Sequence, residues 1–283
     1  MSPRSVAVRA GLRRGLIELR QTLTTPMDLF GFLFTPVILL VVLSFLRTTT
    51  VSGTGLSVAT LSIPGVLGTN IAYGGLMNVV QWLTVEREDG TLLRLKAVPN
   101  GMLGYLVGKV IMVVGTTVLS FAFMLIPGLL LFDGLRALTP SAWLHLTWVV
   151  VLGLAAVTPL GAVLGSLFPN PRSTAAVALP FMGLIAISGI FYPVTAMPQW
   201  VQAIAQVSPI YWLGLGMRSA LLPDSAVLVE IGQSWRTLET VGVLGLWAAL
   251  GLILAPVVLR RMARRESGSS MAARRARALQ RIG

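Results

Sequence analysis

Six long apolar runs dominate this chain, and they set what it can fold into. A helix that crosses the hydrocarbon core of a membrane needs about 20 apolar residues. The chain is 55% hydrophobic and only 11% charged, whereas soluble domains are roughly a quarter charged. The sequence therefore predicts an all-α integral membrane protein with six transmembrane helices within residues 27–260. The predicted spans are Met27–Leu46, Ile63–Leu83, Lys109–Phe132, Trp143–Phe168, Thr174–Phe191 and Val241–Leu259.

Lysines and arginines cluster on one side of these spans. With the N-terminus in the cytoplasm, eighteen of them are cytoplasmic and four lie outside, namely Arg47, Arg136, Arg218 and Arg236. Because Lys and Arg are retained in cytoplasmic loops, we expect a multi-pass plasma-membrane protein with both termini in the cytoplasm. The same asymmetry explains the net charge of +12 through topology and contact with anionic membrane lipids. Nucleic acid is not an expected partner, and residues 261–283 are predicted to form a basic cytoplasmic tail.

Residues 1–26 have the pattern of an amphipathic helix that lies in the membrane interface. Leu12, Leu16, Leu19 and Leu23 recur at helical spacing, and arginines flank them. Such arginines extend toward lipid phosphates. No short apolar core with a small-residue cleavage site precedes the first span, so we expect no cleavable signal peptide. The chain has no cysteine, which excludes disulfides and thiolate metal sites.

A dense run of charges separates the second and third spans, from Thr84 to Pro99. Charges at this density cannot remain in hydrocarbon, so the segment 84–99 is predicted to be a cytoplasmic loop. Gly90 can end the preceding helix in the left-handed conformation, and Thr91 can cap a short helix that stops before Pro99. Such a helix can dock on a partner protein, or the loop can simply maintain topology. The candidate docking residues are Glu86, Arg87, Glu88, Asp89, Gly90, Thr91, Leu92 and Leu95.

The second predicted span carries a polar stripe. Its members recur at helical spacing and are Asn70, Tyr73, Met77, Asn78 and Gln81. Polar groups in a membrane turn away from lipid. Hydrogen bonds between helices account for the stripe in one interpretation, and a translocation path accounts for it in the other.

The segment 192–222 is predicted to lie outside the membrane core as a short re-entrant helical hairpin, because prolines divide it into pieces too short to cross. Trp200, Tyr211 and Trp212 are expected at headgroup depth. The hairpin either seals the outer face or opens as an outer gate. The candidate gate residues are Phe191, Tyr192, Pro193, Pro198, Trp200, Pro209, Tyr211 and Arg218. Arg218 is interpreted as an interfacial anchor or as a partner of Asp224 or Glu230.

Several other activities require residues that the sequence does not offer. The stretch Gly104 to Lys109 is one residue short of a phosphate-binding loop and lacks its hydroxyl. No metal-ligand set and no nucleophile with a base is evident, so we predict no catalytic residue, no metal site and no enzyme. The single histidine, His145, has no acidic neighbour in sequence. An ion-coupled secondary transporter is the weaker alternative, because carboxylates fall only at span ends, and a membrane-embedded enzyme is weaker still.

Two motifs give the chain a resemblance to a known family. The first is Glu86-Arg87-Glu88-x-Gly90-Thr91, followed by Leu95, Pro99, Tyr105, Gly108 and Lys109. The second is Gly189-x-Phe191-Tyr192-Pro193, followed by Met197-Pro198-x-Trp200, Ser208-Pro209-Ile210-Tyr211 and Arg218. Together they resemble type-2 ATP-binding-cassette (ABC) exporter permeases, a group that includes bacterial drug exporters of the daunorubicin-resistance kind. Leu93 departs from the family, which usually carries an acidic residue there.

This resemblance implies a function and a set of partners. It implies a permease that forms a homodimer and is driven by two copies of a separate cytoplasmic ATPase, which binds ATP and magnesium. This chain itself is expected to hold no cofactor. The segment 84–99 would then couple the ATPase to the membrane helices. The expected cargo is a small amphipathic drug or lipid-like molecule leaving the cell, because the spans offer no charged pocket for an ionic solute. The absence of such a pocket also suits export of a polymer.

Overall fold

The computed structural model describes residues 2–50, 55–135, 139–168, 174–190 and 192–265 of the chain. Among these residues the only β pairing is an isolated bridge between Thr50 and Ser57. The helices in chain order are α1 (Pro3–Thr24), α2 (Pro26–Phe45), α3 (Val58–Ala72), α4 (Asn78–Glu88), α5 (Thr91–Lys96), α6 (Gly101–Leu131), α7 (Pro140–Leu167), α8 (Ala175–Ala186), α9 (Gln199–Val207), α10 (Pro209–Leu221) and α11 (Thr237–Arg265). A π-helical turn, Tyr73–Met77, joins α3 to α4, and short 3-10 turns occupy Val194–Ala196, Asp224–Val229 and Ile231–Gln233. The prediction of an all-α membrane protein is confirmed.

Four of the described helices are long and apolar enough to cross a membrane, namely α2, α6, α7 and α11. They correspond to the first, third, fourth and sixth predicted spans. The second predicted span is helical from α3 through α4, but the π turn divides it into pieces of 15, 5 and 11 residues. The fifth corresponds to α8, which has 12 residues and is shorter than the roughly 20 that a crossing needs. The predicted count of six crossings is therefore not established by helix length.

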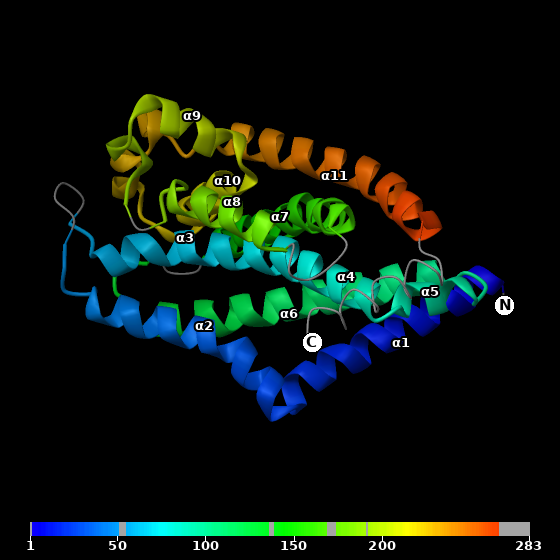
Figure 1. The fold of residues 1–283 in the computed structure, drawn as a ribbon. Coiled ribbons are helices and arrows are strands. Elements are labelled where there is room, and N and C mark those ends of the chain that lie inside the picture. The colour runs from blue at the N-terminus through cyan, green and yellow to red at the C-terminus, as the bar shows by residue number, and fades with distance from the viewer. Residues whose placement is uncertain (1, 51–54, 136–138, 169–173, 191, 266–283) are drawn as a thin grey trace, which may run out of the picture.

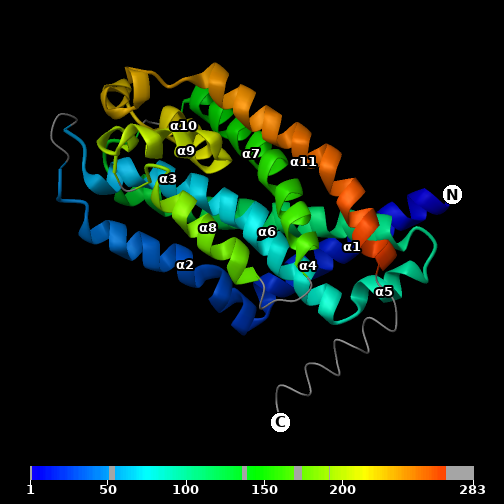
Figure 2. The same ribbon diagram turned by 45° about the horizontal axis from the view of Figure 1, so that its top comes forward.

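Two long helix pairs and one buried helix organise the bundle. The helices α7 and α11 pack side by side (Figure 2). The helix α1 packs on the N-terminal part of α6 (Figure 1). The helix α10 lies between α3, α7 and α11 and is buried at every position. Figure 2 shows α8 and α2 on the opposite side of α3 from α11.

The contact between α1 and α6 is made by glycines. A Cβ atom on Gly11 would collide with the carbonyl oxygen of Gly104, and one on Gly15 would collide with that of Gly108. Small residues at this spacing allow two helix backbones to approach closely. The predicted leucine stripe is divided: Leu12 and Leu16 are exposed, whereas Leu19 packs against Gly115 of α6. The glycines and Leu19 therefore contact protein, and Leu12 and Leu16 are left on the outer surface of α1.

The charged segments gather at one end of the molecule. The N-terminus, α5 and the arginine-rich end of α11 lie together in both views, while α9 lies at the opposite end (Figures 1 and 2). The predicted coupling segment and the start of the predicted basic tail therefore share one end. Most of the tail, residues 266–283, lies outside the described residues.

Candidate functional site

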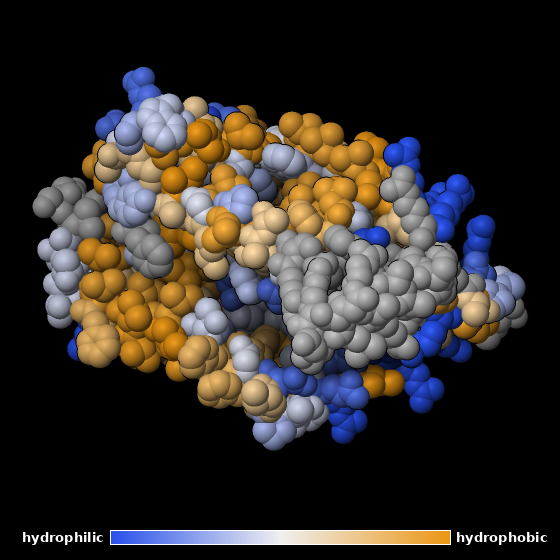
Figure 3. All heavy atoms as spheres, viewed as in Figure 1, coloured by the Kyte–Doolittle hydropathy of each residue, from blue (hydrophilic) through white to orange (hydrophobic). Residues whose placement is uncertain are grey.

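A large cavity opens between α1, α2, α3, α4, α6 and α8, with a volume of about 1010 Å³. Figure 3 shows hydrophilic side chains in a hollow between the hydrophobic surfaces of this face. Its apolar wall includes Met27, Phe32, Leu39, Met112 and Met182. Its polar wall includes Glu18, Gln21, Asp28, Thr69, Asn70, Tyr73, Asn78, Gln81, Trp82, Thr116, Thr117 and Ser120.

The predicted polar stripe forms one wall of this cavity, with one exception. Asn70, Tyr73, Asn78 and Gln81 all line it. Met77 does not line it, because its side chain is turned into the protein core and is only 2% exposed. The π turn at Tyr73–Met77 explains the difference, since it adds one residue to the helix and rotates every later position. Trp82 joins the wall for the same reason.

Hydrogen bonds along this wall are incomplete. The Asn70 side-chain amide donates to the Ser120 hydroxyl at 2.7 Å. Three other atoms of buried wall groups have no hydrogen-bond partner within the described chain: Thr69 Oγ1, Asn70 Oδ1 and Thr117 Oγ1. An unpartnered polar atom in an apolar environment costs on the order of 1–3 kcal/mol. These three oxygens are buried in the packing between the helices and are not exposed to the cavity.

A compact ion cluster ties α1 to α4 and α6 beside the cavity. Lys109 Nζ lies 2.9 Å from Glu18 Oε2 and 2.6 Å from Glu86 Oε1. Arg14 Nε lies 2.7 Å from the other oxygen of Glu18, and the Tyr105 hydroxyl donates to Glu86 at 2.6 Å. We call these five residues the anchor cluster. Because Glu86 is the first of the predicted docking residues, the cluster fixes the start of the segment 84–99 from inside the chain.

The ionisation of Glu18 follows from its neighbours. Burial alone would raise the pKa of its carboxyl group, but the hydrogen bonds from Arg14 and Lys109 favour the charged form more strongly. The pKa of Glu18 is therefore lowered from its ordinary value. The same ion pair raises the pKa of Arg14, although burial opposes the shift.

The predicted coupling helix forms where it was expected. Gly90 has φ of +73° and separates α4 from α5, and α5 ends before Pro99. The predicted cap at Thr91 is wrong: Gly90 occupies the N-cap position without a side-chain bond. Thr91 is the first helical residue, and its hydroxyl accepts from Arg94 at 3.1 Å.

The leucine face of α5 is occupied by this chain. Leu92 is fully buried against Leu83, Tyr105, Leu259 and Met262, and Leu95 packs at the edge of the same cluster. Within this fold Leu92 therefore holds α5 against α6 and α11 and is not free to enter a groove on another protein.

The charged residues of the segment divide into two groups. Glu86 belongs to the anchor cluster, and Arg87 Nη1 donates to the carbonyl oxygens of Ser166 and Phe168 at 3.3 and 3.1 Å. Those carbonyls lie at the end of α7, where cations are favourable. Glu88 and Asp89 are exposed to solvent. The inward group attaches the segment to the bundle, and the outward group is accessible to a partner.

The predicted outer segment forms two short helices, as the prolines indicated. The helix α9 runs from Gln199 to Val207, and α10 begins at Pro209. Trp200 is 68% exposed, as expected of an interfacial side chain. Tyr211 is buried in the protein core, so its side chain does not face the surrounding membrane. The reason is that α10 inserts between other helices and has no face toward lipid.

Some of the other predicted gate residues are exposed and some are buried. Tyr192 and Pro198 are exposed, Pro193 is half-buried and Pro209 is buried, while Phe191 lies outside the described residues. The Tyr192 hydroxyl donates to the carbonyl of Ala186 at 2.5 Å, which joins the segment to the end of α8.

Arg218 forms a buried junction at this end of the bundle. Its side chain is paired with Glu230, with Nε 2.5 Å from Oε1, and Nη1 donates to the Gly189 carbonyl at 3.2 Å. Arg218 is only 4% exposed. It is therefore the ion-pair partner of Glu230 and not an interfacial anchor. His145, near the N-terminal end of α7, shares a hydrogen bond of 3.1 Å with the Ser219 hydroxyl of α10.

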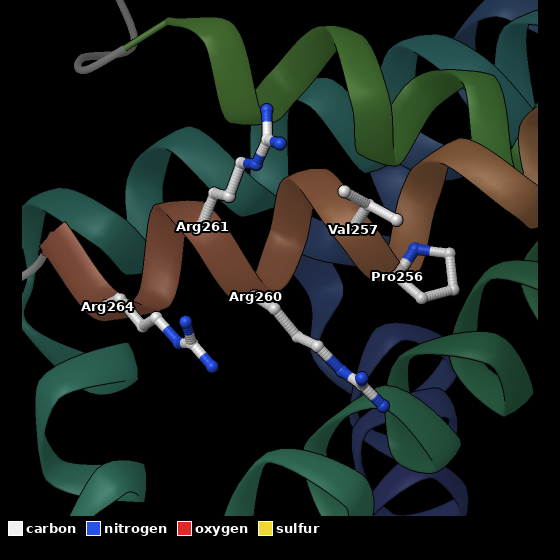
Figure 4. A pocket seen from close by; sticks show the side chains of 5 residues that line it. All are labelled: Pro256, Val257, Arg260, Arg261 and Arg264. Carbon is white, nitrogen blue, oxygen red and sulfur yellow. The ribbon is translucent and has the colours of Figure 1, made fainter.

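A smaller hollow of about 270 Å³ lies at the end of α11, where Arg260, Arg261 and Arg264 border it with Pro256 and Val257. Figure 4 shows Arg261 pointing away from Arg260 and Arg264. The three guanidinium groups do not converge on one point, so this hollow is not built around a single anion.

Several cavity and anchor residues were missed by the sequence analysis. Glu18, Asp28, Trp82 and Thr117 line the cavity from four different helices, and no spacing in the sequence connects them. One signal was available for Glu18, which is the only acidic residue before Asp28 in an arginine-rich segment. An isolated acid of this kind indicates an ion pair.

The fold and these sites define a multi-pass helical membrane protein with a cavity between its helices and a charged segment attached at one end. Residues 44–255 match the family model of the ABC-2 family transporter protein. The chain belongs to this family, which is the membrane component of a transporter and not itself an enzyme. A search of curated proteins finds no match.

Proposed function

We propose that the chain is the permease subunit of an ATP-driven exporter of the ABC class, similar to drug exporters of the daunorubicin-resistance kind. ATP and magnesium would be bound by a separate ATPase. The observation that carries the proposal is the family match over residues 44–255, together with a coupling segment that is attached directly beside a cavity.

The proposed topology has six crossings and both termini in the cytoplasm. The continuous helix from α3 through α4 provides the second crossing. The fifth runs through α8 and the turn that follows it. The gathering of the N-terminus, α5 and the end of α11 at one end of the bundle supports a common cytoplasmic side.

In this proposal the ATPase contacts the outward residues of the segment 84–99. Glu88 and Asp89 are accessible and would form ion pairs at the rim of the ATPase surface. The side of the segment that faces away from the ATPase would be attached to α6, α7 and α11 by Glu86, Arg87, Leu92 and Leu95. Movement of the ATPase is then transmitted to the helices that border the cavity as a rigid-body displacement.

The cavity is proposed as the translocation path for a small amphipathic drug or lipid-like molecule. Its apolar wall would contact the hydrophobic part of the cargo, and Asn70, Tyr73, Asn78 and Gln81 would contact its polar part. The outer segment 192–222 would act as the gate, with the Arg218–Glu230 pair as its fixed point. Two permease chains, in a homodimer, and two ATPase copies would complete the transporter.

The test is gentle purification of the tagged chain from its native membrane, followed by identification of what accompanies it by mass spectrometry. A stoichiometric partner that contains a phosphate-binding loop is the expected result, and ATP hydrolysis stimulated by amphipathic compounds is then the next assay. Recovery of the chain alone from several mild detergents would contradict the proposal and favour a carrier that works without an ATPase.

A further inference from the structure

The outer surface of α1 carries three arginines in a row. Arg9, Arg13 and Arg20 are exposed, and their spacing places them within about 40° of one another around the helix. None of the three forms an ion pair within the described part of the chain. We call them the arginine row. Their charges are available to a partner outside this chain.

Apolar side chains border the arginine row on both sides. Leu12, Leu16 and Leu23 lie about 60° from the row in one direction, and Ile17 lies about 60° from it in the other. All four are exposed. Exposed leucines beside arginines are typical of a helix in the headgroup layer of a membrane. In that layer the apolar side chains reach the acyl chains, and the guanidinium groups extend to the phosphates.

The bend between α1 and α2 suits such a position. Thr25 is extended and Pro26 begins α2, so α1 does not continue the direction of α2 (Figure 1). The helix α2 is long and apolar enough to cross a membrane. A helix that turns away from the end of a crossing helix lies near the membrane surface, where the lipid phosphates are.

The helix α1 has a large excess of positive charge. Residues 3–24 contain five arginines and one acidic residue, Glu18. The helix also packs beside a further cation, because Lys109 of α6 lies 2.9 Å from Glu18. Like charges repel within roughly 8 Å at physiological ionic strength. Anionic headgroups on the arginine row would offset this repulsion and leave α1 more firmly packed on α6.

The anchor cluster connects α1 to the charged segment 84–99. Lys109 joins Glu18 of α1 to Glu86 of α4, at 2.9 and 2.6 Å. Arg14 of α1 lies 2.7 Å from Glu18 and 3.9 Å from Glu86. The packing of α1 on α6 therefore sets how firmly the start of the segment is held.

We propose that the outer surface of α1 binds anionic phospholipid headgroups, and that this binding tightens the attachment of the segment 84–99 through the anchor cluster. The partner is a phospholipid with a net negative charge, such as phosphatidylglycerol. The inference goes beyond the proposed function, because it concerns regulation by the surrounding membrane. It requires neither a particular cargo nor a bound ATPase.

The first test measures thermal unfolding of the purified full chain in phosphatidylcholine nanodiscs, without and with about 30 mol% phosphatidylglycerol. A ligand that binds only the folded state stabilises it, so we expect the melting temperature to rise by about 4 °C with phosphatidylglycerol. Sodium chloride at about 0.5 M should remove the rise, because salt screens charges at the surface. Inorganic phosphate added to phosphatidylcholine nanodiscs should give no rise, which distinguishes a lipid headgroup from a free anion.

The variant Arg9→Gln/Arg13→Gln/Arg20→Gln should lose most of that rise. Its three positions are exposed, so the substitutions leave the packing of α1 on α6 unchanged. A variant that keeps the full rise would overturn the proposal.

The matched control removes the same number of charges from the same end of the molecule. Arg260, Arg261 and Arg264 of α11 are exposed, and none of them belongs to the anchor cluster (Figure 4). The variant Arg260→Gln/Arg261→Gln/Arg264→Gln should keep most of the rise. Equal losses in the two triple variants would show that the response follows net charge alone, and would also overturn the proposal.

The second test follows the segment itself. The chain has no cysteine, so Asp89→Cys provides a single exposed site for a nitroxide label. Electron paramagnetic resonance should show lower mobility of this label with phosphatidylglycerol than without it. Adding Glu18→Gln should remove the difference, because the arginine row is intact but its connection to Lys109 is broken. The triple variant of the arginine row should remove the difference as well.

The two tests contradict different parts of the proposal. Label mobility that does not depend on the lipid in the native background would overturn the connection through the anchor cluster. A lipid dependence that persists in the Glu18→Gln background would overturn it too. Neither assay contains an ATPase or a cargo, so failure here is separate from failure of the proposed function.

Discussion

Lys109 on α6 and Glu86 on α4 form an ion pair of 2.6 Å at the point where the helix from the cavity passes into the charged segment. The same ammonium group reaches Glu18 on α1 at 2.9 Å. One lysine therefore joins three helices that are far apart in the sequence. Both partners are largely buried, so the loss of either leaves a charge that is difficult to solvate.

The first prediction concerns this pair. Lys109→Met should destabilise the fold by about 2 kcal/mol, because two carboxylates lose their shared cation. Thermal unfolding in detergent measures the effect. The double variant Glu86→Gln/Lys109→Met should lose less stability than the sum of the two single variants, because each single variant leaves a charge without its partner. Additive losses would show that the pair contributes nothing specific.

The glycine contact between α1 and α6 gives a second prediction. Gly11→Ala should destabilise the fold by about 1–3 kcal/mol, since the added methyl group meets the backbone of Gly104. Gly242→Ala, in α11, is the matched control because its Cβ would meet nothing within 4 Å. That control should be neutral or stabilising by up to about 1 kcal/mol. Equal effects of the two substitutions on the melting temperature would contradict the packing assignment.

The division of the charged segment gives a third prediction. The double reversal Glu88→Lys/Asp89→Lys should weaken association with the ATPase about tenfold without a change in melting temperature. Glu86→Lys should weaken association and also lower the melting temperature, because it breaks the anchor cluster. Co-purification yield and thermal unfolding, measured side by side, separate the two effects. Full ATPase recovery with the double reversal counts against an outward docking face.

The polar wall gives a fourth prediction. Asn70→Ala and Asn78→Ala should change substrate preference in a transport assay while the chain still inserts and assembles. The stability cost should be about 1 kcal/mol or less per residue, the size of a hydrogen bond between membrane helices. Met77→Ala serves as a contrast, since its core position predicts a loss of stability without a change in preference. Unchanged preference in both asparagine variants would refute the assigned path.

The lowered pKa of Glu18 gives a fifth prediction. A carboxyl group with a lower pKa in the folded state stabilises the fold above its ordinary pKa of 4.5. That contribution is lost as the pH falls through the lowered value. The melting temperature of the native chain should therefore exceed that of Glu18→Gln at neutral pH, and the gap should narrow in acid. A gap that does not depend on pH would mean that the carboxylate charge is not the stabilising feature.

Much of the fold could be predicted from local pattern. Long apolar runs require long helices, so α2, α6, α7 and α11 appear where expected. Gly90 and Pro99 are local signals, and they bound α5. The prolines at 198 and 209 likewise divide the outer segment as expected.

Features that depend on packing between distant segments were less predictable. Tyr211 is an amphipathic aromatic residue typical of an interface, yet α10 is drawn into the core by contacts with three other helices. Glu86 has the same chemistry as Glu88, but it lies on the face of α4 that meets Lys109 and Tyr105 of α6. Four stripe residues line the cavity, whereas Met77 departs because the helical period is not constant through the π turn.

That π turn has a consequence for the phase of the whole helix. One additional residue between Tyr73 and Met77 sets the direction, about the helix axis, in which each later side chain of the helix points. These side chains include Glu86 at the start of the charged segment. Each residue of an α-helix advances by about 100°. If the turn relaxed to α-helical geometry, α4 would revolve by about that angle relative to α3. The orientation of the cavity wall and the orientation of the coupling segment are therefore locked to each other by a single inserted peptide unit.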